Sequence, residues 1–127
     1  MQTVLLFVGR KGIAQTLVKR LSVIPEIKAH LEYDYTNADS AVRKHSADTV
    51  LIEASESKNE DIIYCLSVCA LLHSVAPSCK LLLLCPESYP KGVAKAIDAR
   101  KDGVIDDFVF YDASVDYIVS KLLSMQA

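Results

Sequence analysis

Three short segments, each built around an unbroken apolar run, constrain the fold of this chain more than any other feature. They are Thr3–Val8 (TVLLFV), Asp48–Glu53 (DTVLIE) and Lys80–Cys85 (KLLLLC), and none shows strict alternation of apolar and polar side chains. A strand with one solvated face alternates, whereas a strand that is buried on both faces reads as a continuous apolar run. The three runs therefore predict central strands of a parallel sheet with helices on both faces.

The segments between these runs have apolar residues at three- and four-residue spacing, which is typical of amphipathic helices. The expected helices are Gly12–Ser22, Ala38–His45, Glu60–Val75, a weak helix through Val93 and Ile97 that Gly103 closes, and a last helix after Ser114. Asn37 and Ser114 are residue types that cap helix N-termini. The polar segment Ala54–Asn59 is expected to form the loop after the third strand.

Two further strands complete the pattern. Ala29–Thr36 alternates loosely and carries charged residues, as an edge strand does, and Asp107–Tyr111 (DFVFY) is the fifth strand. Regular alternation of strands and helices implies a parallel sheet with right-handed crossovers. We therefore expect a single α/β domain over residues 1–127. Its architecture would be a (βα)5 doubly wound, five-stranded parallel sheet of flavodoxin-like order 2-1-3-4-5.

Composition argues against several kinds of partner. The net charge of −2 gives no concentrated basic surface for a nucleic acid. No apolar run reaches the ~20 residues that a membrane helix needs. The first apolar run is soon followed by the basic residues Arg10 and Lys11, which argues against a signal peptide. We therefore expect a cytoplasmic protein.

The cysteines and histidines give no sign of a metal or redox site. The four cysteines lie in apolar segments without metal-ligand spacing, so we expect reduced, buried thiols and no bound metal or other cofactor. The three histidines lie in different elements, and solvated or capping positions are expected for them. The tyrosines Tyr33, Tyr35 and Tyr64 are expected to cover the margins of the sheet.

Glu53 is the residue whose role matters most for the function of the chain. It closes the third expected strand, and in open α/β sheets ligands gather beyond the carboxyl ends of the strands. Three roles are open for it: a group in a site, a permanent negative charge that mimics a phosphorylated aspartate, or a solvated acidic residue without a role.

Two segments of the chain resemble the receiver domains of two-component response regulators. Asp48-x-x-Leu-Ile-Glu53 is similar to the family's D-x-x-L-x-D at the phosphoacceptor strand. Gly103–Tyr111 (GVIDDFVFY) is similar to its G-A-D-D-Y-L-x-K before the last helix, with one residue inserted. The order of elements agrees over essentially the whole chain. The resemblance implies a CheY-like fold and a role in signal transduction by a phosphorelay.

The residues at the family's site positions differ from its pattern. The phosphoacceptor aspartate corresponds to Glu53, the acidic pair that holds Mg²⁺ to Gly9 and Arg10, the Thr or Ser to Cys85, and the Lys to Tyr111. Mg²⁺ requires oxygen ligands, and an arginine would repel it. A thiol is a weaker hydrogen-bond partner than a hydroxyl, and a tyrosine supplies no positive charge.

This pattern of losses predicts a degenerate pseudo-receiver that signals by protein–protein contact and is not an enzyme. A buried carboxylate needs a partner, so we expect Arg10 or Lys11 to reach Glu53 in place of a metal. Two alternatives remain: an atypical but active receiver, phosphorylated on a side chain such as Ser55, or a flavodoxin-like small-molecule binder. The second lacks the glycine-rich phosphate loop after the first strand.

The expected partner is a kinase-like or output domain, or a second copy of the chain. In the family, the face made by the fourth helix, fifth strand and fifth helix is a common dimer interface. Here the basic residues Lys95, Arg100 and Lys101 could oppose acidic residues of a second copy, among them Asp107 and Asp112.

Overall fold

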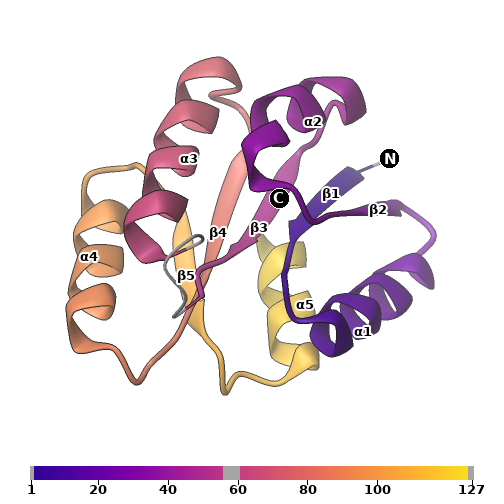
Figure 1. Cartoon of the computed structure of the whole chain (residues 1–127). Coiled ribbons are helices and arrows are strands. Elements are labelled where there is room, and N and C mark those ends of the chain that lie inside the picture. The colour runs from indigo at the N-terminus through magenta and orange to yellow at the C-terminus, as the bar shows by residue number, and fades with distance from the viewer. Residues whose placement is uncertain (1, 56–60, 126–127) are drawn as a thin grey trace.

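The computed structural model describes residues 2–55 and 61–125. Within these residues, five strands and five α-helices alternate, with one short 3₁₀-helix, η1, before α2 (Figure 1). The elements are β1 (Gln2–Phe7), α1 (Lys11–Ser22), β2 (Ile27–Glu32), η1 (Tyr35–Asn37), α2 (Ala38–His45), β3 (Thr49–Glu53), α3 (Ile62–Val75), β4 (Lys80–Cys85), α4 (Pro90–Lys101), β5 (Asp107–Phe110) and α5 (Val115–Ser124).

All strand pairs are parallel and the sheet has the order β2-β1-β3-β4-β5, which confirms the predicted topology. β3 lies at the centre, where Val50 pairs with Leu5 of β1 on one side and with Leu81 of β4 on the other. Every residue of β3 is buried, as its unbroken apolar run predicted. Because parallel strands end at the same edge, the residues after β1 and β3 are brought together there.

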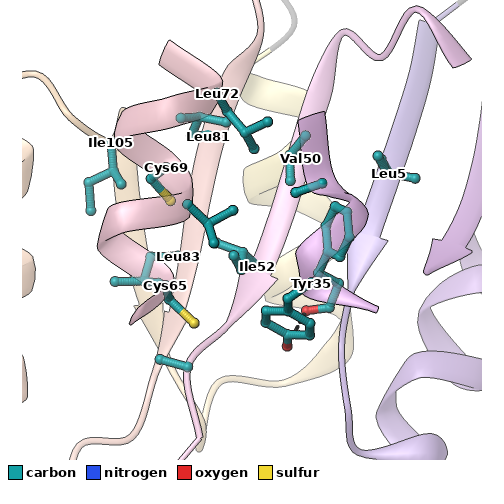
Figure 2. Packing of buried hydrophobic residues seen from close by; sticks show 14 of the residues in the cluster. Leu5, Tyr35, Val50, Ile52, Cys65, Cys69, Leu72, Leu81, Leu83 and Ile105 are labelled. Atoms are coloured by element: carbon teal, nitrogen blue, oxygen red, sulfur yellow. Dashed lines mark hydrogen bonds between the residues drawn. The ribbon is translucent and has the colours of Figure 1, made fainter. Parts of the chain in front are cut away.

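Two hydrophobic cores lie on opposite faces of the sheet. Helices α2, α3 and α4 cover one face, and α1 and α5 cover the other (Figure 1). In the first core, Cys65, Cys69 and Leu72 of α3 pack against strand side chains such as Ile52 and Leu83 (Figure 2). All four cysteines are buried free thiols, as predicted. Burial raises the pKa of Cys69 and of Cys79 to about 12, which makes both poor nucleophiles.

The predicted second strand, Ala29–Thr36, is wrong at both ends, because β2 spans Ile27–Glu32. The chain leaves the sheet where the Asp34 side chain accepts a hydrogen bond from the Thr36 backbone N–H and starts η1. Tyr35 therefore does not cover a sheet margin. It is only 6% exposed, and its ring meets that of Phe7 edge to face at 5.5 Å.

Helix boundaries follow local hydrogen bonding. Ser114 caps α5 as predicted, its side chain accepting from the Tyr117 N–H. Asn37 does not cap α2, because it ends η1 and its amide donates to Asp34 instead. Gly103 follows α4 with φ of +79°, the left-handed conformation expected after a helix. The expected start of α3 at Glu60, and most of the loop expected at Ala54–Asn59, lie outside the described residues; Asp61 caps α3.

Helix α4 packs on the sheet through small residues. Gly92, Ala96 and Ala99 are buried, whereas Ile97, which was expected to point inward, is 40% exposed. No described helix combines the length and the apolar character that crossing a bilayer requires.

Two of the histidines are not isolated, contrary to the sequence-based expectation. His30 of β2 and His45 of α2 stack, with ring centroids 4.0 Å apart and planes at 24°. Burial, then His45, Lys28 and Lys44, lower the pKa of His30 below its ordinary value. Protonation of His30 would bury part of a positive charge and place it near Lys28 and Lys44.

This contact predicts a loss of stability in mild acid. The unfolded chain binds a proton to His30 at higher pH than the folded chain does, so unfolding becomes easier as pH falls through and below 6.5. Urea unfolding at about pH 7.5 and about pH 5.5 should show a loss of at most about 1 kcal/mol that His30→Gln removes. His73→Gln, on the exposed side of α3, should keep the native pH dependence; an equal effect of both substitutions would contradict the assignment.

Candidate functional site

The carboxyl edge of the sheet brings the β1–α1 connection against the end of β3. Gly9 and Arg10 follow β1, and Glu53 is the last residue of β3, the strand beside it. Glu53 is only 2% exposed. The possibility that it is a solvated acidic residue is therefore wrong.

Both carboxylate oxygens of Glu53 are bonded within the chain. Oε1 accepts hydrogen bonds from the backbone N–H groups of Gly9 (3.1 Å) and Arg10 (3.2 Å). Oε2 accepts from Nε of Arg10 at 2.6 Å, which forms an ion pair. The expected contact between a basic residue and Glu53 is thus present, and Arg10 makes it. Charge-assisted bonds of this kind are stronger than bonds between neutral groups.

Tyr111 holds the other side of the arginine. The guanidinium carbon of Arg10 lies 3.9 Å from the centroid of the Tyr111 ring, a cation–π contact. The Tyr111 hydroxyl donates to the carbonyl oxygen of Ala54, directly after β3. Arg10 is therefore fixed between a carboxylate and an aromatic face. We call Gly9, Arg10, Glu53 and Tyr111 the strand-end cluster.

Cys85 does not join the strand-end cluster, although it ends the neighbouring strand. Its side chain is fully buried in the core beneath α3 and α4, and its thiol contacts the Pro86 carbonyl oxygen at 3.8 Å. Burial, and then the charge of Glu87, raise the pKa of Cys85 to about 11. Four of the five predicted site residues therefore meet, and the fifth is a core residue.

Tyr35 is a site residue that the sequence-based prediction placed elsewhere. Its hydroxyl hydrogen-bonds the carbonyl oxygens of Phe7 (2.9 Å) and Glu53 (2.7 Å), so it joins the ends of β1 and β3 beneath the cluster. The Asp34-Tyr35-Thr36 turn was the available signal, because such a turn ends a strand and directs the next side chain differently.

The strand-end cluster does not fit a divalent cation. Mg²⁺ needs several oxygen ligands in near-octahedral geometry, and the residues after β1 offer no carboxylate. Glu53 has both oxygens occupied, and a guanidinium lies where a cation would be repelled. The described residues contain no group of three or more His, Cys, Asp or Glu side chains able to hold a metal.

The residues predicted for a dimer face are partly engaged within the chain. Asp107 bonds Lys121 of α5, and Nε of Arg100 lies 3.4 Å from its other oxygen. Burial works to raise the pKa of Asp107, but the hydrogen bonds and positive charge around it outweigh that effect and lower the pKa. Among the described residues, Lys95, Lys101 and Asp112 form no ion pair.

Sequence comparisons do not assign the chain to a family. No protein-family model matches it, and no curated protein matches it by sequence.

Structural comparisons are informative about the fold. A LuxR-family DNA-binding response regulator from Staphylococcus aureus is similar with a TM-score of 0.79 and 12% identity, covering 100% of both chains. A signal receiver domain of an HD domain-containing protein from Pseudomonas fluorescens has a TM-score of 0.78 and 22% identity, covering 98% of this chain and 86% of the other. A structure described as an adenylate cyclase from Rhodopirellula baltica has a TM-score of 0.83 and 14% identity, covering 98% of this chain and 87% of the other. The chain therefore has the fold of the response-regulator receiver domains.

Proposed function

We propose that this chain is a pseudo-receiver, a signal-transduction module that works by binding other proteins and is not phosphorylated on an aspartate. The fold, shared with a response regulator from Staphylococcus aureus and a signal receiver domain from Pseudomonas fluorescens, supports a role in two-component signalling. The proposed partners are a kinase-like domain or an output domain. We propose a role in binding rather than catalysis, because fold alone grants no chemistry and the described residues at the strand ends assemble no catalytic set.

A single observation supports this proposal most strongly. Arg10 supplies the positive charge that a metal ion would otherwise supply, because its side chain and its backbone N–H both bond the carboxylate of Glu53. An internal cation of this kind neutralises the carboxylate permanently, so the site needs no Mg²⁺ for stability. The same pairing argues against Glu53 as a mimic of a phosphorylated aspartate, since its charge is compensated inside the domain.

Treatment with a small acyl-phosphate donor and Mg²⁺ tests the proposal. We expect the intact mass of the native chain to remain unchanged under conditions that phosphorylate an ordinary receiver domain run in parallel. Addition of one phosphoryl group would contradict the proposal. If addition occurs, Glu53→Gln and Ser55→Ala locate it: loss in the first identifies a glutamyl phosphate, and loss in the second identifies the atypical receiver.

A further inference from the structure

Helix α3 has an unusual surface for a helix at the outside of a domain. Its sequence, Ile62–Val75, contains no Asp, Glu, Lys or Arg. A helix that is apolar all round is normally covered on all sides. Here the outer side remains open, and Ile63 is 60% exposed, Leu71 47% and Val75 38%.

Beside this exposed side runs a groove between α3 and α4, which lie next to each other (Figure 1). It is a shallow, open depression of about 420 Å³. The apolar residues that line it come from both helices and the turn after α4: Ile63, Leu66, Ala70, Ala99 and Val104. Ile63 belongs both to this lining and to the exposed side of α3, so the two join into one apolar surface that another protein can contact.

The α4 wall of the groove carries charges of both signs. Lys95, Asp98 and Asp102 line it, and their spacing of three and four residues places them on one side of the helix. None of the three forms an ion pair within the described part of the chain. The positive charge lies toward the start of α4 and the negative charges toward its end.

We propose that a second copy of this chain covers the α3–α4 groove. A two-fold interface brings the same patch of both copies together, so the patch must complement itself. Antiparallel packing of the two α3–α4 pairs, as in a four-helix bundle, places Lys95 of each copy opposite the Asp98–Asp102 segment of the other. The apolar floors of the two grooves then meet in the middle.

This interface differs from the face made by α4, β5 and α5 that the sequence suggested. Three acidic groups of that face are engaged in their own chain, whereas Asp112 forms no ion pair with a described residue. Asp107 bonds Lys121, Asp116 bonds Arg20, and Asp106 accepts from the backbone N–H of Leu81. The charges along the α3–α4 groove have no such partners, so they are available to a second copy.

The size of the surface sets the expected affinity. α3 has 14 residues and α4 has 12, so each helix is about 20 Å long. At a spacing of about 10 Å, two such helices cover roughly 20 Å by 20 Å, which is small beside the ~800 Å² per partner of a standard stable interface. Small interfaces are typical of weak, transient contacts, so we expect a reversible dimer that forms at protein concentrations up to ~1 mM and does not depend on the chemistry at Glu53.

Sedimentation velocity over a range of protein concentration tests this dimer. The native chain should associate reversibly as its concentration rises to ~1 mM. Ile63→Glu, which puts a charge on an exposed apolar position, should remain monomeric. A native chain that is monomeric at ~1 mM would overturn the proposal, as would unchanged association of Ile63→Glu.

Charge-swap variants distinguish this interface from any other. Lys95→Glu makes the groove wall wholly acidic and Asp98→Lys/Asp102→Lys makes it wholly basic, so each should weaken self-association at least about tenfold. An equimolar mixture of the two should associate again. Failure of the mixture to associate, or native association of Lys95→Glu alone, would overturn the antiparallel arrangement.

Lys101→Glu is the matched control. Lys101 is exposed on the same helix but does not line the groove, and the sequence-based prediction assigned it to the face made by α4, β5 and α5. It should associate like the native chain. Weakening by Lys101→Glu with no effect of Lys95→Glu would assign the dimer to that other face and overturn the proposal.

Discussion

Replacing Arg10 by alanine is expected to lower the free energy of unfolding by about 2 kcal/mol, because it leaves a buried carboxylate without its counter-charge. Loss of one partner from a fully buried pair costs about 3–5 kcal/mol. The cost is smaller here because the Arg10 side chain is 40% exposed and the Gly9 N–H still bonds Glu53. Chemical denaturation monitored by circular dichroism measures the difference.

Arg20→Ala provides the matched control for this substitution. Arg20 also pairs with a carboxylate, Asp116, but both side chains are more than half exposed. Exposed pairs contribute up to about 1 kcal/mol, so Arg20→Ala should have a small effect. The double variant Arg10→Ala/Glu53→Gln should be more stable than Arg10→Ala alone, because the amide carries no charge. Equal losses of unfolding free energy for Arg10→Ala and Arg20→Ala would show that the Glu53 pair stabilises the fold no more than an exposed ion pair does.

The second large effect is expected at Tyr35. Truncation to alanine removes a buried ring that packs on Phe7 and should cost about 3–5 kcal/mol. Tyr35→Phe keeps the ring but removes the hydroxyl that bonds the carbonyl oxygens at the ends of β1 and β3, and it should cost about 1–2 kcal/mol.

The exposed Tyr33 supplies the comparison. Its side chain is 47% exposed, so Tyr33→Phe should change the free energy of unfolding by no more than about 0.5 kcal/mol. Amide hydrogen exchange adds a local readout, since Tyr35→Phe should reduce protection near Phe7 and Glu53. If Tyr35→Phe were as neutral as Tyr33→Phe, the hydroxyl would not join the two strands.

Central strands were predictable because their residues meet the same environment on both sides. The runs around Leu5, Val50 and Leu81 are mostly apolar, so their central places in the sheet were predictable and their boundaries were correct to within one residue. Edge elements are less constrained. The end of β2 depends on one side-chain hydrogen bond at Asp34, which competes with the strand pattern of alternating residues.

At the site, residues that end neighbouring parallel strands were predictable, but the directions of their side chains were not. Arg10 and Glu53 had to lie close because β1 and β3 are adjacent, and the attraction between their opposite charges brings the two side chains together. Whether Cys85 would point to the cluster or to the core depended on packing beneath α3 and α4. The stacking of His30 on His45 joins a strand to a helix, and no local pattern specifies such a contact.

We infer that Arg10 closes the strand-end cluster to divalent cations. The most direct test is a titration of the native chain with Mg²⁺ while following its backbone amide NMR signals, with Arg10→Asp/Glu53→Asp as the variant that restores two carboxylates at that edge. We predict no saturable shift at Gly9, Arg10 or Glu53 in the native chain, and saturable shifts in the variant. Saturable binding of Mg²⁺ beside Glu53 in the native chain would show that Arg10 does not exclude the cation.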